Sequence, residues 1–253
     1  MRNAQLSARF VLVSIMAVLP GLGLCSVAAA GAASPSVSSA AVRSVGPAGG
    51  DVVGVAAPIT IGFATPVVDR ALAERTIAIV PSRPVSGHFT WTNDTEVRWS
   101  PDGYWPAYTD VMVVAGGLKT DFKVGAALYA VADLSAHVFN VSINGDLVRE
   151  MPASMGKPGH ETPTGQFSII DKYRTIVMDS STYGVPVNSP EGYKLNVDWA
   201  QRIIGGIFVH SAPWSVDSQG YENVSHGCIN LSPSNAQWYF NNSHYGDPVV
   251  VTW

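Results

Sequence analysis

The side chains best suited to covalent chemistry gather around Cys228, in a segment that reads SHGCIN over residues 225–230. A thiol needs a base or a positive environment to become a nucleophilic thiolate near neutral pH, because its free pKa is about 8.5. Two histidines can supply that base: His226, two positions before the thiol, and His210, 18 positions before it. His210 ends the β-like run Ile207–Val209, so a strand would hold its ring rigidly, as a general base requires. The pattern predicts a cysteine nucleophile with an imidazole base.

The direction of the His226 ring depends on the local backbone. In an extended chain it shares a face with Cys228, whereas in a tight turn it points elsewhere. Gly227 allows a sharp turn directly before the thiol, and the backbone N–H groups of Gly227 and Cys228 can then form an oxyanion hole. A second interpretation stays open, in which His210, His226 and Cys228 bind zinc as a His₂Cys set. The chain has no Cys-x-x-Cys spacing that would support it.

The rest of the composition excludes several classes of function. The formal net charge of −4 excludes a nucleic-acid binder that works through a basic surface, and equally a polybasic membrane anchor. With 47% hydrophobic and only 13% charged residues, the 253-residue chain predicts packed domains and no long disordered region. His137, His160 and His244 have no partner nearby in the sequence, and we expect them to be exposed or satisfied in the core.

The first 33 residues have the pattern of a secretory signal peptide. Arg2 and Arg9 precede an almost wholly apolar stretch over residues 10–24, and small residues over 27–33 suit cleavage. The apolar stretch is shorter than the roughly 20 residues of a membrane-spanning helix, although an uncleaved anchor is the alternative. Cleavage removes Cys25 and leaves Cys228 as the single cysteine, without a disulfide partner. We therefore expect a secreted protein with no transmembrane span in its mature form.

Residues 45–122 predict a β-sandwich domain, preceded by a flexible linker over residues 34–44 that is rich in Ala and Ser. Short β-rich runs alternate with turn residues at a spacing of about ten residues, which is typical of a sandwich. The runs are Ile59–Phe63, Thr76–Val80, His88–Trp91, Glu96–Trp99 and Asp110–Val114. The glycine-containing stretch 116–125 is expected to form the junction to a second domain.

Residues 123–253 predict a second, mostly-β domain that carries Cys228. The dipeptide Asn144-Gly145 between two alternating runs predicts a hairpin with a type I′ turn. One short helix is expected, with Ser232 as its cap and Pro233 in its first position. The expected strands are Leu128–Asp133, His137–Ile143, Asp146–Met151, Gln166–Ile170, Thr175–Met178, Tyr193–Trp199, Gly206–His210 and Val249–Thr252. The fold class predicted for the whole chain is all-β.

The combination of His210 with SHGCIN resembles the signature of the L,D-transpeptidases, whose catalytic domain is of the YkuD type. The stretch TPTGQF over residues 162–167 resembles a second hallmark of that family, a Thr-Pro-x-Gly-x-Phe turn. The resemblance runs from about Ala126 to Trp253. With its leader and single sandwich, the chain is similar to the short mycobacterial or actinobacterial L,D-transpeptidases. Its first domain resembles their bacterial immunoglobulin-like (Ig-like) module.

The resemblance implies a role for each residue of the motif. The cysteine of the family motif is the nucleophile, which corresponds to Cys228. The upstream histidine, His210, is the general base or the ion-pair partner of the thiolate, and the backbone carbonyl of Ser211 orients it. The backbone N–H groups of His226, Gly227 and Cys228 are the expected oxyanion donors.

The resemblance also implies which residues contact the substrate. Positions that correspond to substrate contacts of the family are Tyr193, Gly205, Gly206 and Asn230. Positions that resemble apolar residues of the donor cleft are Met178, Tyr183 and Trp214. Gly205 departs from the serine often found there, which leaves a side-chain contact at that position open. Packing beneath a loop is the alternative role for Met178 and Tyr183.

The implied reaction is acyl transfer between peptidoglycan stem peptides. Cys228 cleaves the bond between diaminopimelate and D-Ala of a tetrapeptide stem and forms a thioester, which the diaminopimelate amine of another stem resolves. The scheme needs no metal or organic cofactor. Carbapenems mimic the acyl donor and are expected to acylate the same thiol. The expected location is the periplasmic space or the cell wall.

Other functions stay open on the residues alone. A cell-wall cysteine peptidase or L,D-carboxypeptidase would use the same thiol and imidazole, with water as the acceptor. A transpeptidase that attaches proteins to peptidoglycan would use them too. An inactive wall-binding module would tolerate replacement of Cys228.

Overall fold

The computed structural model describes residues 40–253. The expected signal peptide and the first residues of the expected linker lie outside the described residues. Within residues 40–253, no helix combines the length and the apolar character needed to cross a bilayer.

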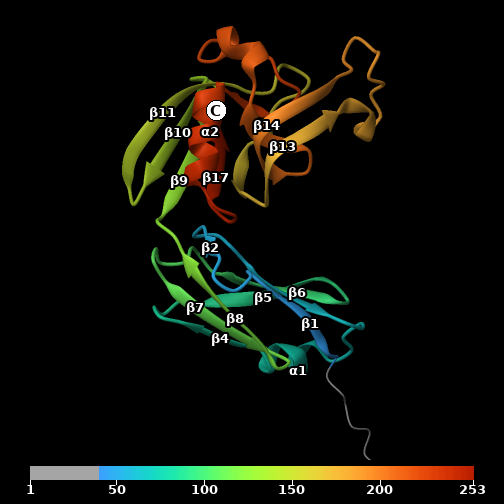
Figure 1. Ribbon diagram of the computed structural model, residues 1–253, viewed down its shortest axis with the longest axis vertical. Helices are drawn as coiled ribbons and strands as arrows, with labels where there is room; N and C mark the ends of the chain where they lie inside the picture. Colours follow the sequence, from blue (N-terminus) through green and yellow to red (C-terminus); the bar gives the residue numbers. More distant parts are fainter. Residues whose placement is uncertain (1–39) are drawn as a thin grey trace, which may run out of the picture. The chain divides into compact units, whose positions relative to one another are not determined.

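The first domain is a sandwich of two four-stranded sheets, which confirms the predicted architecture. One sheet has the order β1-β3-β6-β5 and the other β2-β8-β7-β4 (Figure 1). The first sheet contains β1 (Val42–Gly46), β3 (Ile59–Phe63), β6 (Glu96–Pro101) and β5 (Gly87–Asn93). The second contains β2 (Val52–Val53), β8 (Leu118–Val124), β7 (Asp110–Ala115) and β4 (Ala78–Pro81). Alternate residues of both sheets, such as Ile61 and Val113, are fully buried between them, as a two-layer β domain requires.

The borders of this domain differ from those expected. The stretch 116–125 does not form the expected junction between the domains. Gly116 and Gly117 form the turn of a hairpin, and β8 follows them as a paired strand of the sandwich. The expected boundary between residues 122 and 123 therefore falls inside β8. The expected linker also ends sooner, because β1 begins at Val42. A short helix, α1 (Arg70–Arg75), was not foreseen; the Asp69 side chain caps it by accepting from the Leu72 N–H at 2.9 Å.

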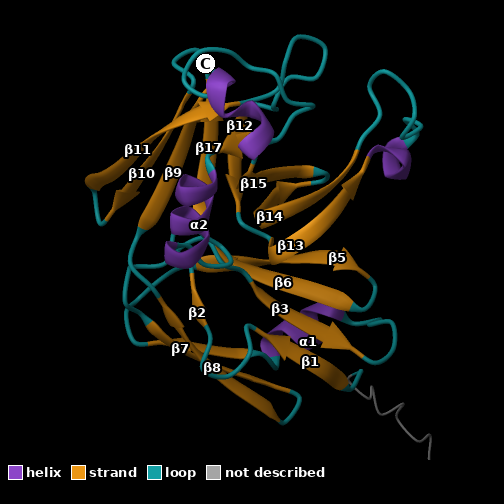
Figure 2. Cartoon of the chain, turned by 45° about the horizontal axis from the view of Figure 1, so that its top comes forward, coloured by secondary structure: helices purple, strands orange, loops and turns teal. Residues whose placement is uncertain are grey.

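The second domain is built on one nine-stranded sheet with the order β12-β17-β9-β10-β11-β16-β15-β14-β13 (Figure 2). Its strands are β9 (Leu128–Asp133), β10 (Val138–Ile143), β11 (Asp146–Ser154), β12 (Gly165–Ser168), β13 (Asp171–Asp179), β14 (Lys194–Ile204), β15 (Ile207–Ser211), β16 (Ile229–Leu231) and β17 (Pro248–Thr252). Two short 3₁₀ helices, η1 (Ser180–Tyr183) and η2 (Pro213–Ser218), join the strands. The predicted hairpin turn at Asn144-Gly145 joins β10 to β11.

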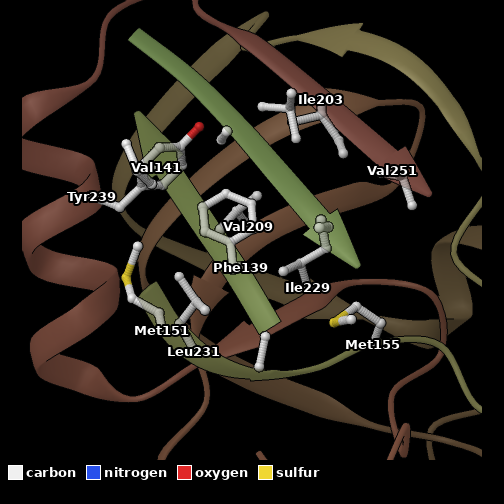
Figure 3. Close-up of a cluster of buried hydrophobic side chains, with 14 of the residues drawn as sticks. Phe139, Val141, Met151, Met155, Ile203, Val209, Ile229, Leu231, Tyr239 and Val251 are labelled. Atoms are coloured by element: carbon white, nitrogen blue, oxygen red, sulfur yellow. The ribbon is translucent and has the colours of Figure 1, made fainter. Parts of the chain in front are cut away.

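The predicted helix is α2 (Pro233–Asn242), and it completes the core of the second domain. The Ser232 hydroxyl accepts from the Asn235 N–H at 3.4 Å, as expected of its cap. Figure 1 shows α2 between β10 and β14. Its Tyr239 ring meets Phe139 of β10 edge-on, with ring centroids 4.9 Å apart and both residues fully buried. Figure 3 shows this contact among the other buried side chains.

The strand that matters most for the site was not predicted. β16 has only three residues, all of them buried, so it carries no alternation of apolar and polar residues. It pairs in parallel with β15, with Val209 opposite Ile229 and His210 opposite Asn230. The strand that carries the expected base, β15, is therefore the direct neighbour of the strand that follows the expected nucleophile, β16.

Candidate active site

The register of β15 and β16 brings the expected base and nucleophile to one face of the sheet. Paired residues of neighbouring strands project to the same face, so His210 and Asn230 lie together. Cys228 precedes Asn230 by two positions and shares that face. These side chains line a cavity of about 340 Å³. The other residues that line it are Met178, Tyr193, Leu195, Val197, Trp214, Ser215, Ser218, Val224, Ser225 and His226.

The His210 ring is held in one tautomer. Its Nδ1 lies 2.9 Å from the Ser211 carbonyl oxygen, which can only accept a hydrogen bond, so Nδ1 carries the proton. The neutral ring then has an unprotonated Nε2, the atom that a general base uses. Burial lowers the pKa of His210 to about 4, against the opposing effect of the Ser211 carbonyl. The ring is therefore neutral and held in one orientation at physiological pH.

The Cys228 thiol is half-buried, and its Sγ donates to the Gly206 carbonyl at 3.7 Å. Burial raises the pKa of Cys228 to about 11, although the backbone N–H of Phe208 works in the other direction. The Cys228 thiol, whose pKa is raised, and the His210 imidazole, whose pKa is lowered, line one cavity. Both are neutral in the resting state, because neither group gains from transferring the proton. Of the two roles left open for His210, this favours the general base over the ion-pair partner.

The loop that leads into the thiol is fixed by hydroxyl groups. Ser225 Oγ donates to the Cys228 carbonyl at 2.7 Å and accepts from the Gly227 N–H at 3.0 Å. The expectation that the Gly227 N–H faces an oxyanion is therefore wrong for this structure, because Ser225 occupies that donor. The N–H groups of His226 and Cys228 remain the candidates. Gly227 has a φ of 118°, in the left-handed region that favours glycine, and this gives the loop its turn.

Thr162, in the TPTGQF stretch, holds the same loop from the other side. Its Oγ1 donates to the Gly227 carbonyl at 2.8 Å and accepts from the Gly156 N–H at 2.9 Å. We expect Thr162→Val to lower the free energy of unfolding by about 1–3 kcal/mol, because it leaves both buried partners unpaired. Acylation of Cys228 should slow as well, since Gly227 is bonded directly to it. Denaturant unfolding and acylation rates measure the two effects.

Thr162→Ser is the matched control, because it keeps the hydroxyl and removes only the methyl group. It should retain more of the stability and the acylation rate than the valine variant. Unfolding and acylation of Thr162→Val at wild-type levels would show that these hydrogen bonds do not position the loop.

His226 lies in a turn, and its ring is bonded away from the thiol. Its Nε2 is 2.7 Å from Glu191 Oε2, and its ring centroid is 5.4 Å from that of Tyr193. The ring still lines the cavity. Of the two histidines, His226 is therefore bonded to Glu191, whereas His210 lies on the strand next to the one that follows Cys228.

The residues expected to contact substrate divide into two groups. Tyr193, Asn230, Met178 and Trp214 line the cavity, whereas Tyr183 and Gly205 are not among its lining residues. Gly206 reaches the site only through its carbonyl, which accepts from the thiol. The Tyr183 side chain is half-exposed, and its ring lies 6.2 Å from that of Tyr193. Burial raises the pKa of Tyr193 above its ordinary value, with a further contribution from Tyr183, so the Tyr193 hydroxyl remains protonated.

Several lining residues were not foreseen. Leu195 and Val197 project from alternate positions of β14, and the period-two pattern of the strand was the available signal. Ser215 and Ser218 lie on η2, which no sequence pattern indicated. The Ser215 hydroxyl accepts from the Asn230 amide at 3.1 Å, so it fixes a side chain that was expected to bind substrate.

Two of the other histidines have partners that are distant in the sequence, and the zinc interpretation is wrong. His160 is not isolated, because its ring packs edge-on against His226 with centroids 4.8 Å apart. Among residues 40–253, the group of His, Cys, Asp and Glu side chains close enough to hold a metal is His160, Glu191 and His226. The proposed His₂Cys set of His210, His226 and Cys228 is not such a group. His137 has a partner too, with its Nδ1 3.1 Å from Asn223 Oδ1.

Comparison with known proteins decides the family. Residues 127–251 match the L,D-transpeptidase catalytic domain family, and residues 32–117 match a bacterial Ig domain family. L,D-transpeptidase 1 of Mycobacterium tuberculosis is 53% identical over 186 residues, which cover 73% of this chain and 74% of the relative. The chain belongs to the L,D-transpeptidase family. This confirms the resemblance carried by His210, SHGCIN and TPTGQF.

Solved structures of L,D-transpeptidases share the arrangement of the chain. The complex of LD transpeptidase LdtMt1 with imipenem superposes with a TM-score of 0.78 at 52% identity, covering 84% of this chain and 99% of that one. L,D-transpeptidase 3 of Mycobacterium tuberculosis, in complex with a faropenem-derived adduct, has a TM-score of 0.75 at 43% identity and covers 84% of this chain and 98% of that one. The mostly-β fold of this L,D-transpeptidase, with an Ig-like domain before the catalytic one, is thereby confirmed.

Proposed function

We propose that this L,D-transpeptidase cross-links peptidoglycan, with Cys228 as nucleophile and His210 as general base. The observation that carries the assignment is the position of the two side chains: both line one cavity, and the Ser211 carbonyl fixes the His210 tautomer that can accept the thiol proton. The family membership supports acyl transfer as the reaction.

Acylation starts from the neutral pair. As Cys228 Sγ bonds to the carbonyl carbon at the L-centre of diaminopimelate, its proton passes to His210 Nε2. The oxyanion of the tetrahedral intermediate accepts hydrogen bonds from the backbone N–H groups of His226 and Cys228. Collapse of the intermediate breaks the bond to D-Ala, whose amine takes the proton from His210. The product is a thioester on Cys228 and free D-Ala.

In the second step, the acyl group passes from Cys228 to the amine of a second stem. The side-chain amine of a second stem attacks the thioester carbonyl, and His210 takes the proton that the amine loses. The carbon–sulfur bond then breaks, and the departing sulfur regains that proton as a thiol. One cross-link forms, and the enzyme returns to its starting state. The two half-reactions need a nucleophile and a base, which these two side chains supply.

The cleft offers an apolar wall and a few polar groups to the donor stem. Met178, Leu195 and Val197 form apolar surface from β13 and β14, whereas Asn230 and Tyr193 supply hydrogen-bonding groups. This combination suits an extended peptide whose backbone amides need partners and whose aliphatic stem needs packing.

The proposal includes covalent inhibition by carbapenems. A carbapenem presents a strained carbonyl to the thiol, and ring opening leaves a thioester of the same kind as the natural intermediate. The two relatives' structures hold imipenem, a carbapenem, and an adduct derived from faropenem, a related β-lactam, which supports β-lactams as inhibitors of this chain. A wall substrate places the enzyme outside the cytoplasmic membrane, in agreement with the expected leader and with the Ig-like domain.

The product of a single incubation separates transfer from hydrolysis. We expect the protein, mixed with a tetrapeptide stem, to release D-Ala in equal amount to a cross-linked dimer of stems, both measured by mass spectrometry. D-Ala with tripeptide and no dimer would identify an L,D-carboxypeptidase instead. If neither D-Ala nor a thioester intermediate formed, the proposal would be refuted, and the inactive wall-binding module would be the function that remains.

A further inference from the structure

Two histidines and a glutamate meet at the edge of the cavity, outside the pair that performs the chemistry. They come from three separate segments: His160 from the loop before β12, Glu191 from the loop before β14, and His226 from the loop before the nucleophile. One ligand atom of each lies within 4.8 Å of those of the other two. The reaction derived above uses neither His160 nor Glu191.

The donor set fits a zinc-class ion. Imidazole nitrogen and carboxylate oxygen are ordinary zinc ligands, and three protein ligands leave a fourth position for water. Ligand atoms around one tetrahedral zinc lie about 3.3 Å apart for bonds of about 2.0 Å, so the side chains need move little from their present positions. His160 and Glu191 are exposed and His226 is half-buried, which gives an ion direct access from solvent.

A competing cation already occupies part of the cluster. Lys157 Nζ lies 2.6 Å from Glu191 Oε2, the same oxygen that His226 approaches. Exposed ion pairs of this kind contribute little to stability, so an ion can displace the ammonium at small cost.

We propose that His160, Glu191 and His226 bind a divalent zinc-class ion, and that the bound ion slows acylation of Cys228. The ion would join the Glu191 loop to the segment 226–228, and it would fix the His226 ring, which lines the cavity. Tyr193 follows Glu191 by two residues and stacks near His226, so the same ion would restrict a cleft residue. The effect on acylation rests on the proposed function, whereas metal binding does not.

Calorimetric titration with Zn²⁺ tests the site without reference to activity. The full chain carrying Cys228→Ala should bind one equivalent, which excludes the thiol as a ligand. His160→Gln and Glu191→Gln in that background should each weaken binding by roughly 10- to 100-fold. Lys157→Met should tighten it, because the competing ammonium is removed. His88→Gln, an exposed histidine of the first domain that pairs with Asp102, is the matched control and should have no effect.

Two outcomes would overturn the site. Binding that disappears in Cys228→Ala would place the metal on the thiol. Binding that His160→Gln and Glu191→Gln leave unchanged would place it elsewhere on the chain.

The effect on acylation has its own measurement. Zn²⁺ should slow carbapenem acylation of the wild-type protein, and a chelator should restore the rate. His160→Gln should need at least tenfold more Zn²⁺ for the same inhibition, in line with its weaker binding, while its metal-free rate stays at the wild-type level. Stoichiometric binding with an unchanged acylation rate would refute the regulatory half and leave only the metal site. A chain that binds Zn²⁺ as expected but acylates with no substrate would refute the proposed function and leave the site intact.

Discussion

A Cys228→Ala variant is expected to form no carbapenem adduct and to release no D-Ala from a tetrapeptide stem. Removing the nucleophile of a covalent mechanism costs on the order of 10⁶-fold, because neither the base nor the oxyanion donors can replace it. The fold should survive, since the thiol is half-buried and its hydrogen bond to the Gly206 carbonyl, at 3.7 Å, is weak. Intact-protein mass spectrometry and thermal unfolding measure the two halves of the prediction.

Cys228→Ser is the matched control for this experiment. A serine hydroxyl keeps the position and the hydrogen-bonding capacity of the thiol but is a much weaker nucleophile, so acylation should fall almost as far as in the alanine variant. Peptide mapping of the wild-type adduct should place the added mass on the peptide that contains Cys228. An adduct of equal yield on Cys228→Ala would mean that another side chain is the nucleophile.

The sequence predicts the regular parts of the fold well, because their signals are local. The strand Leu128–Asp133 was predicted with the bounds of β9, since alternating small apolar residues bury one face. The Ser232-Pro233 start of α2 was recognised for the same reason: a cap and a first-position proline act within one turn. Neither needs information from distant residues.

What the sequence could not predict depends on long-range geometry. β16 forms because its three residues fit between β11 and β15, and nothing in them alone indicates a strand. His160 meets His226 although 66 positions separate them in the chain. Likewise, the motif suggests oxyanion donors but not that Ser225 takes the Gly227 N–H, because that depends on the exact turn.

His210→Asn is expected to slow acylation by about 10²- to 10⁴-fold, the range attributed to a positioned general base. The asparagine amide can still donate to the Ser211 carbonyl, but it offers no basic nitrogen to the thiol. The pH profile separates this role from a structural one. In the wild type, the rate should be level between pH 6 and 9. In His210→Asn, it should rise about tenfold per pH unit across that range, because attack then depends on spontaneous ionisation of a thiol whose pKa is raised to about 11.

The direction in which the wild-type acylation rate changes with pH follows from the pKa values of His210 and Cys228. The base acts when it is neutral, and burial lowers the pKa of His210 to about 4, so the rate is lost only as the pH falls below that value. Between about 4 and 11 both groups stay neutral, and the reactive state is fully populated. An ion pair between thiolate and imidazolium would instead require a thiol pKa below that of the imidazole. His88→Asn should match the wild type. A wild-type rate that climbs tenfold per unit from pH 6 to 8 would show that His210 does not take the proton.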